Sequence, residues 1–197
     1  ESEKKSQTKI NSINLNISTV DSISKYYESE IFISDQQITD LHLKKAINQS
    51  EYFDESENYF NLINDIIAYD LDKRVLHTDP IGNYANNIKI YFYKLQINYK
   101  YLKNISNLIK DLKLKIDSYI PTPLSSALST LSKDERNLGT ICIDLGHSTT
   151  STSIFENNKF IYGDSFLVGS NNVTTDIARG VSTTLSSAER LKTLYGS

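Results

Sequence analysis

The stretch that most constrains the fold of this chain is Leu138–Glu156, which reads LGTICIDLGHSTTSTSIFE. An apolar run ends at Asp144, a short Gly/Ser/Thr segment follows, and a second β-branched run covers Ser151–Phe155. This pattern indicates two strands joined by a tight polar turn. Such a turn can present backbone N–H and hydroxyl donors to a phosphate, with the acid near a metal-bound water. Polar hairpin turns are also abundant in proteins that bind no phosphate, so the turn alone leaves both interpretations open.

Several further segments accompany this hairpin in a fixed order. They are Asp79–Gly82 (DPIG), Leu124–Leu131 (LSSALSTL), Lys133–Gly139 (KDERNLG), Gly169–Ala178 (GSNNVTTDIA) and Ala188–Lys192 (AERLK). With them, the hairpin resembles the second phosphate loop of the actin and sugar-kinase superfamily, an Asp-x-Gly-Gly-Gly-Thr-Thr turn. The ordered set resembles FtsA, the actin homologue of bacterial cell division, from about Ile13 onward. The whole set is far more specific than any one segment.

The resemblance implies an α/β fold of the actin-like ATPase (ribonuclease H-like) type, with an inserted small α/β subdomain of the FtsA 1C (SHS2) type. Residues 1–33 would end subdomain 1A, 34–120 would form the 1C-like subdomain, 121–139 the returning helix of 1A, and 140–197 the start of the second actin-like domain, from 2A into 2B. The family's first phosphate loop should lie upstream, but no Asp-x-Gly motif is found there. Because the chain contains no methionine, we expect an excised or incomplete piece of a longer protein, unless the initiator was trimmed.

The resemblance also implies that ATP with Mg²⁺ binds at three of these segments in the intact protein. The implied residues are Asp144, Gly146, His147, Ser148, Thr149, Thr150, Gly169, Ser170, Glu189 and Lys192. Asp144 would hold Mg²⁺ through water, the turn would surround the β- and γ-phosphates, and Gly169 would let the second ATPase half approach the nucleotide. Glu189 and Lys192 would bracket the ribose, although an exposed i, i+3 ion pair has the same sequence pattern. No catalytic residue can be assigned, so we expect at most a weak ATPase.

Four positions depart from the family pattern. His147 and Ser148 stand at the second and third glycines of the loop, Ser151 replaces an Asp that often follows the threonines, and Ser170 replaces a neighbour of Gly169. Glycine permits positive φ and close approach of backbone to phosphate, so a Cβ at residue 147 or 148 costs strain and room. These 197 residues, without the first phosphate loop and the adenine half of the pocket, are expected to bind ATP weakly or not at all.

Composition excludes several classes of function. The net charge of −3 gives no basic footprint for nucleic acid. The single cysteine, Cys142, gives neither a disulfide scaffold nor a zinc-ligand spacing. No apolar run approaches membrane-spanning length. No Ser/His/Asp, Cys/His or metal cluster can be assembled, so another type of enzyme ranks third among the interpretations.

The resemblance implies partners and a location for the protein. It implies self-association into filaments through the 1C-like subdomain and contact with FtsZ and other division proteins. It also implies membrane attachment only by a C-terminal helix that is not in this sequence. The location would then be the cytoplasmic face of the membrane at the division site. The alternative is a nucleotide-free actin-like scaffold, such as a PilM-type relative in pilus assembly, and His147 and Ser148 favour it.

Periodicity predicts the remaining elements. Strands are expected at Ile10–Val20, Glu30–Ile33, Tyr59–Leu71, Ile88–Tyr93, Leu114–Ile120, Phe160–Tyr162 and Phe166–Val168. Helices are expected at Asp40–Gln49, Tyr99–Leu112 and Leu124–Leu131. A further helix is expected from Thr175 to about Val181, with Thr174 as its cap. The last helix is expected to begin at Ser186, which forms a capping box with Glu189, and to bury Leu191 and Tyr195. In Ile88–Tyr93, the apolar face is Ile88, Ile90 and Phe92, and Tyr93 lies on the opposite face. The acidic stretch Glu51–Asn58 is expected to be a loop.

Overall fold

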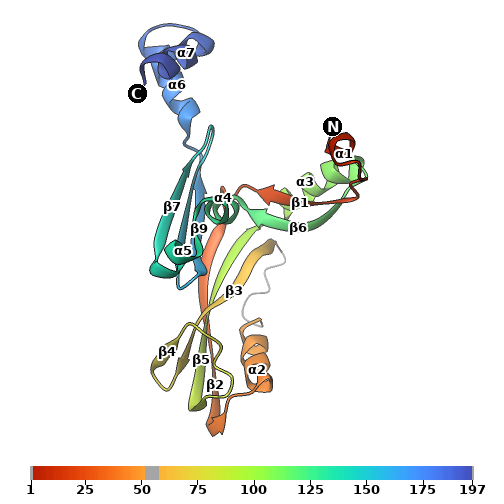
Figure 1. The fold of residues 1–197 in the computed structure, drawn as a ribbon, viewed down its shortest axis with the longest axis vertical. Helices are drawn as coiled ribbons and strands as arrows, with labels where there is room; N and C mark the ends of the chain where they lie inside the picture. The colour runs from red at the N-terminus through yellow and green to blue at the C-terminus, as the bar shows by residue number, and fades with distance from the viewer. Residues whose placement is uncertain (1, 52–57, 197) are drawn as a thin grey trace.

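A computed structural model of the chain describes residues 2–51 and 58–196. It is elongated, with a long sheet at one end, a helix pair at the other, and a lobe that projects from the side (Figure 1). Most of the acidic stretch predicted to be a loop, residues 52–57, lies outside the described residues. Among the residues that the structure describes, no helix is long and apolar enough to cross a membrane.

The long sheet has four antiparallel strands in the order β2 (Ile23–Gln37), β5 (Tyr84–Asn98), β3 (Tyr59–Leu71) and β4 (Arg74–Leu76). Helix α2 (Asp40–Glu51) begins and ends near the predicted residues, because Thr39 precedes it and its apolar stripe faces the sheet. The core between helix and sheet includes Ile31, Ala46, Ile88, Ile90 and Phe92. Strand β2 is much longer than predicted, and its pairing with β5 is interrupted by a bulge between Phe32 and Gln36, where Ser34 and Asp35 have positive φ.

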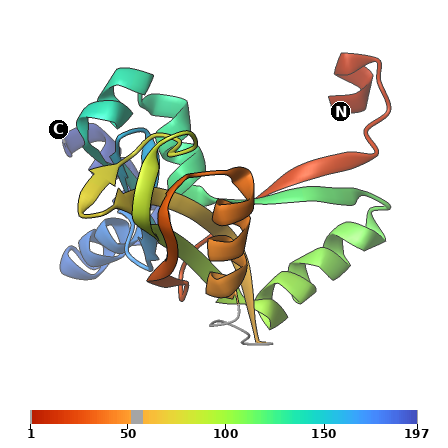
Figure 2. The same ribbon diagram turned by 90° about the horizontal axis from the view of Figure 1, so that it is seen from below.

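The projecting lobe is built from the parallel pair β1 (Ser12–Ile17) and β6 (Lys115–Pro121), with α3 (Tyr99–Asp111) packed against it and the short α1 (Ser2–Ser6) before it. Figure 2 shows β1 and β6 leading away from the four-stranded sheet. The Asn98 side chain caps α3 by accepting a hydrogen bond from the Lys100 amide at 2.9 Å. A cluster of Ile17, Ile97 and Leu102 joins the lobe to the end of β5.

A second sheet has the antiparallel order β7 (Thr140–Leu145), β8 (Thr150–Glu156), β9 (Lys159–Phe166), and so confirms the predicted hairpin. The prediction of two strands after it is wrong: β9 is one strand, and Leu167 and Val168 lie beyond its end. Helices α4 (Thr122–Thr130) and α5 (Lys133–Leu138) connect β6 of the projecting lobe to β7 of this sheet. Between the sheets lie Ile63, Tyr93, Leu95, Ala127, Phe155 and Phe160. Tyr93 is fully buried, because the second sheet covers the face of β5 that was predicted to be polar.

The helix pair α6 (Ser170–Gly180) and α7 (Leu185–Tyr195) extends the second sheet at the far end of the molecule (Figure 1). Three predictions fail here. Helix α6 begins at Ser170, so Thr174 lies inside it instead of capping it. Thr184, not Ser186, caps α7, since its Oγ1 accepts from the Ser187 amide at 3.3 Å. Ala188 is the buried residue of α7, whereas Leu191 and Tyr195 are 37% and 78% exposed.

Candidate functional site

The turn between β7 and β8 is closed by its own backbone. The Gly146 amide donates to the Thr149 carbonyl at 2.9 Å, and Asp144 pairs with Ser151 just before it. A Cβ at residue 146 would lie 2.7 Å from the Thr149 carbonyl oxygen. Only glycine therefore fits at this position without a shift of the turn. The turn therefore requires glycine at position 146 for a steric reason that does not involve a ligand.

Asp144 is half-buried at the end of β7 and is held by a residue that was not predicted as part of the site. Ser126 Oγ, on α4, donates to Asp144 Oδ2 at 2.5 Å. The second carboxylate oxygen, Oδ1, has no hydrogen-bond partner within the described part of the chain. A fixed carboxylate with one free oxygen fits a metal-bound water. Ser126 belongs to the LSSALSTL segment, but nothing in that segment indicates which strand α4 packs against.

The turn also docks on the start of α6. The Ser170 amide donates to the Gly146 carbonyl at 3.0 Å, and the Asn171 amide donates to the His147 carbonyl at 2.9 Å. A Cβ on Gly169 would collide with the His147 carbonyl and would lie 2.8 Å from the Gly146 carbonyl oxygen. Thr150 Oγ1 adds a hydrogen bond to the Val168 carbonyl at 2.7 Å. The structure thus places the Asp144 loop and the Gly169 segment in direct contact.

Glu189 and Lys192 lie together on α7 and face α6. Lys192 Nζ is 2.8 Å from Glu189 Oε2 and donates to Thr174 Oγ1 at 2.8 Å, while that hydroxyl donates to Glu189 Oε2 at 2.5 Å. Lys192 Nζ also reaches the Ser170 carbonyl at 3.4 Å. The two side chains thus form the ion pair that their spacing allowed. Thr174, expected only as a helix cap, is the buried hydroxyl that joins them.

Electrostatics connect this pair to the loop. Hydrogen bonds from Lys192 and Thr174, and the charges of Lys192 and His147, hold the pKa of Glu189 below its usual value, against a smaller opposing effect of desolvation. The three predicted segments meet at one place, where the hairpin turn contacts the helix pair.

Free donors remain on the outer side of the turn. Among the described residues, the backbone N–H groups of His147 and Ser148 have no acceptor, and both side chains are exposed. Backbone amides aimed outward from a tight turn are the donors that bind phosphate oxygens. With Asp144 on the adjoining strand, the turn fits a phosphate and its hydrated Mg²⁺. The backbone amides of Ser170 and Asn171, at the start of α6, already donate hydrogen bonds to carbonyls of the turn.

Comparison with known proteins gives consistent results for most of the chain. The family model "Cell division protein FtsA" matches residues 141–197. The cell division protein FtsA of Rhizobium meliloti (strain 1021) is 30% identical over 188 residues, which are 95% of this chain and 42% of that protein. The FtsA protein of Agrobacterium fabrum is 29% identical with the same coverage, and that of Helicobacter pylori (strain 26695) is 27% identical over 65% of this chain and 26% of its own length. This chain therefore spans less than half of the curated relatives it matches.

A solved structure supports the fold. The PilM-PilN type IV pilus biogenesis complex contains a chain that matches 98% of this chain with a TM-score of 0.56 and 12% sequence identity, over 54% of its own length. At this identity the similarity concerns the fold alone. It confirms the predicted fold class, an α/β fold of the actin-like ATPase type.

Proposed function

Because this chain is an FtsA-type sequence, as its ordered motifs predicted and its relatives confirm, we propose that it belongs to a bacterial cell-division protein that binds ATP with Mg²⁺. The observation that carries the proposal is the meeting of three segments that lie far apart in the sequence. The turn after Asp144 contacts the start of α6 through two backbone hydrogen bonds, and Glu189 and Lys192 flank the same helix.

Each group has a role in this proposal. The amides of His147 and Ser148 and the hydroxyls of Ser148 and Thr149 bind phosphate oxygens. Asp144, oriented by Ser126, accepts hydrogen bonds from the water around Mg²⁺. Gly169 allows the α6 segment to lie against the turn, and Glu189 and Lys192 exchange part of their mutual contact for the ribose hydroxyls. Bound Mg²⁺ neutralises phosphate charge, and no residue here is assigned as a general base.

Titration calorimetry with Mg²⁺-ATP tests this proposal, in a protein of the relatives' length that contains this sequence. We expect micromolar binding that is weakened at least about tenfold, or about 1.4 kcal/mol, by Asp144→Ala. Asp134→Ala, on exposed α5, is the matched control and should leave binding unchanged. The 197 residues alone should bind weakly or not at all. If neither the wild type nor a His147→Gly/Ser148→Gly variant binds, the phosphate-loop assignment is wrong.

A nucleotide-free scaffold is the second candidate, and one observation favours it. The amides of Ser170 and Asn171 donate to carbonyls of the turn, so these donors at the start of α6 are not available to a phosphate. His147 and Ser148 also add side chains where glycines stand in the family. Binding that appears only in the His147→Gly/Ser148→Gly variant would support this candidate.

The remaining functions implied by the family belong to the same proposal. Residues 34–120 form the 1C-like subdomain through which copies associate into filaments. Tyr84, on β5, and Phe32, on β2 just before these bounds, are 69% and 78% exposed and are candidate contacts. The protein links FtsZ and other division proteins to the cytoplasmic face of the membrane at the division site. Sedimentation with and without Phe32→Glu tests the filament contact, since a charge at an apolar interface should abolish pelleting.

A further inference from the structure

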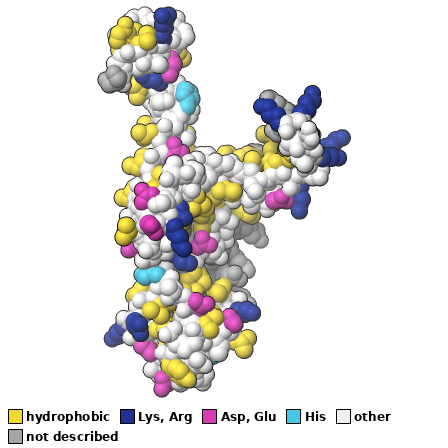
Figure 3. Space-filling model, in the orientation of Figure 1, with side chains coloured by type: hydrophobic (Ala, Val, Ile, Leu, Met, Phe, Trp, Pro, Cys, Tyr) yellow, Lys and Arg dark blue, Asp and Glu magenta, His cyan; other side chains and the backbone are white. Residues whose placement is uncertain are grey.

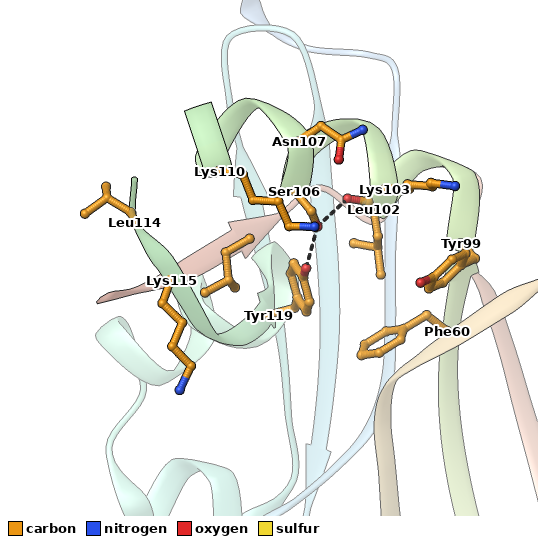
Figure 4. Close-up of a pocket in the computed structure, with 11 residues that line it drawn as sticks. Phe60, Tyr99, Leu102, Lys103, Ser106, Asn107, Lys110, Leu114, Lys115 and Tyr119 are labelled. Carbon is orange, nitrogen blue, oxygen red and sulfur yellow. Dashed lines mark hydrogen bonds between the residues drawn. The ribbon is translucent and has the colours of Figure 1, made fainter. Parts of the chain in front are cut away.

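A groove in the projecting lobe lies far from the candidate nucleotide site. It encloses about 600 Å³ between α3 and the start of β6, within the range of about 300–1,000 Å³ that is usual for ligand sites. Figure 4 shows helix α3 along one side and Tyr119 and Phe60 beneath it. The two aromatic rings meet edge-on with centroids 5.5 Å apart. The two rings therefore give the groove an apolar floor.

Two hydroxyls inside the groove, those of Ser106 and Tyr119, are already satisfied. Ser106 Oγ donates to the Leu102 carbonyl at 2.7 Å and lies 2.7 Å from the Tyr119 hydroxyl. These contacts hold α3 against β6, as Figure 4 shows. A ligand would therefore meet an apolar floor, and its charged groups would meet only the rim.

The rim carries a single sign of charge. Lys103, Lys110 and Lys115 line the groove, and no Asp or Glu is among the described residues that line it. Lys115 has an exposed partner, Asp117, at 3.7 Å. Lys103 and Lys110 are exposed and have no carboxylate within ion-pair distance in the described part of the chain. Figure 3 shows that Lys and Arg side chains gather on this lobe, although the whole chain carries a net charge of −3.

We propose that this groove binds an acidic peptide segment of a partner protein, with an aromatic or leucine side chain on the Phe60–Tyr119 floor and carboxylates at Lys103 and Lys110. Charge complementarity gives the sign of the ligand, since three lysines surround a site without acidic residues. The concave apolar floor favours a side chain over a membrane surface, because a flat bilayer cannot enter a hollow of this kind. This site is independent of ATP binding.

Fluorescence anisotropy with the 197-residue chain tests the proposal. The probe is a labelled peptide of sequence Glu-Asp-Leu-Phe-Glu-Asp, and the comparison peptide is Gln-Asn-Leu-Phe-Gln-Asn. We expect a dissociation constant on the order of 10–100 μM for the acidic peptide and none measurable for the neutral one. Lys103→Glu/Lys110→Glu should weaken binding at least about tenfold.

The matched control is Lys44→Glu/Lys45→Glu, which makes the same charge change on two exposed residues of α2. It should leave peptide affinity within about twofold. Equal losses in the two double variants would mean non-specific attraction and would overturn the proposal, as would no binding by the wild type. Vesicles of phosphatidylglycerol in phosphatidylcholine provide the other arm. If they bind through Lys103 and Lys110 while the peptide does not, the groove is a membrane contact and the peptide proposal is wrong.

Discussion

The four-stranded sheet and the α6–α7 pair are built on opposite principles. The sheet buries a continuous set of side chains, and residues 92–97 of β5 are buried on both faces, including Lys94 and Gln96. In the helix pair, Val173, Val181, Leu185 and Leu194 are each more than half exposed, and the main buried residues are Thr174, Ala178 and Ala188. The sheet is therefore stabilised by apolar burial and the helix pair by hydrogen bonds and caps. The candidate nucleotide site lies in the weaker region, where local opening is less costly.

The largest effect should come from the sheet core. Ile90→Ala removes a fully buried side chain of the α2–sheet cluster and should lower the free energy of unfolding by about 2–5 kcal/mol. Val173→Ala, on a 52% exposed residue of α6, is the control and should change it by less than about 0.5 kcal/mol. Urea denaturation followed by circular dichroism measures both. Similar losses in the two variants would remove the contrast between the regions.

A second prediction concerns the junction of the two sheets. The Gly163 amide of β9 donates to the Tyr93 hydroxyl at 2.9 Å, and Ser24 Oγ lies 3.0 Å from the same oxygen. Tyr93→Phe leaves a buried N–H without its acceptor and should cost about 1–3 kcal/mol. Tyr84→Phe, on a 69% exposed ring, should be neutral. If Tyr93→Phe has the same free energy of unfolding as the wild type, the two sheets are not coupled through this hydroxyl.

Alkaline pH tests the same residue. Burial raises the pKa of Tyr93 from 10.0 to about 12, although its hydrogen bonds act in the opposite direction. Because the folded state retains this proton more strongly, the stabilisation is complete below pH 10 and is lost as the pH rises from 10 towards 12. Unfolding curves of wild type and Tyr93→Phe should therefore converge over this interval. If the difference in stability between the two proteins stays constant from pH 10 to pH 12, the stabilisation does not come from the buried Tyr93 hydroxyl.

A smaller and local effect should appear in the helix pair. Thr184→Ala removes the side chain that caps α7 and should cost that helix about 1 kcal/mol. Hydrogen exchange should speed up in α7 and leave β5 unchanged, if the pair opens independently of the sheet. Ser186→Ala is the control, since Ser186 lies within α7 and does not cap it. Faster exchange in β5 as well would mean that the molecule unfolds as a single unit.

The smallest predicted effect is the titration of Glu189. The hydrogen bond from Lys192, with that from Thr174, lowers its pKa, so its contribution is present above the unfolded pKa and lost as the pH falls through the folded one. Protection factors of the α6 amides, which are corrected for the intrinsic exchange rate at each pH, should therefore fall in acid. Glu189→Gln should remove this pH dependence, whereas Glu156→Gln, on β8, should not. If Glu189→Gln keeps the same acid sensitivity, that sensitivity comes from another carboxylate.

Local sequence patterns were sufficient to predict most of the individual helices and strands and the hairpin. Two apolar pairs, Leu62-Ile63 and Ile66-Ile67, predicted β3 at its observed residues, and a helical stripe over Tyr99–Leu112 predicted α3 to within one residue. The Asp144 turn was predicted from its Gly/Ser/Thr content. These features depend on neighbours within a few positions. The ordered motifs also predicted the similarity to FtsA proteins that the comparisons found, because an ordered set of motifs is more specific than any single one.

Contacts between distant segments set two features that local patterns did not predict. They bury the second face of strand β5, and they set the start of helix α6. Tyr93 was placed on a polar face, since a period of two separates the faces of a strand but does not reveal a second sheet packed on it. Helix α6 starts at Ser170 because carbonyls of a distant turn accept its first amides. Glu189 pairs with Lys192 and Thr174 instead of completing a cap, since α6 lies beside it. Contacts between segments remote in sequence leave no periodic signal, and for that reason the site's connections appear only in the folded chain.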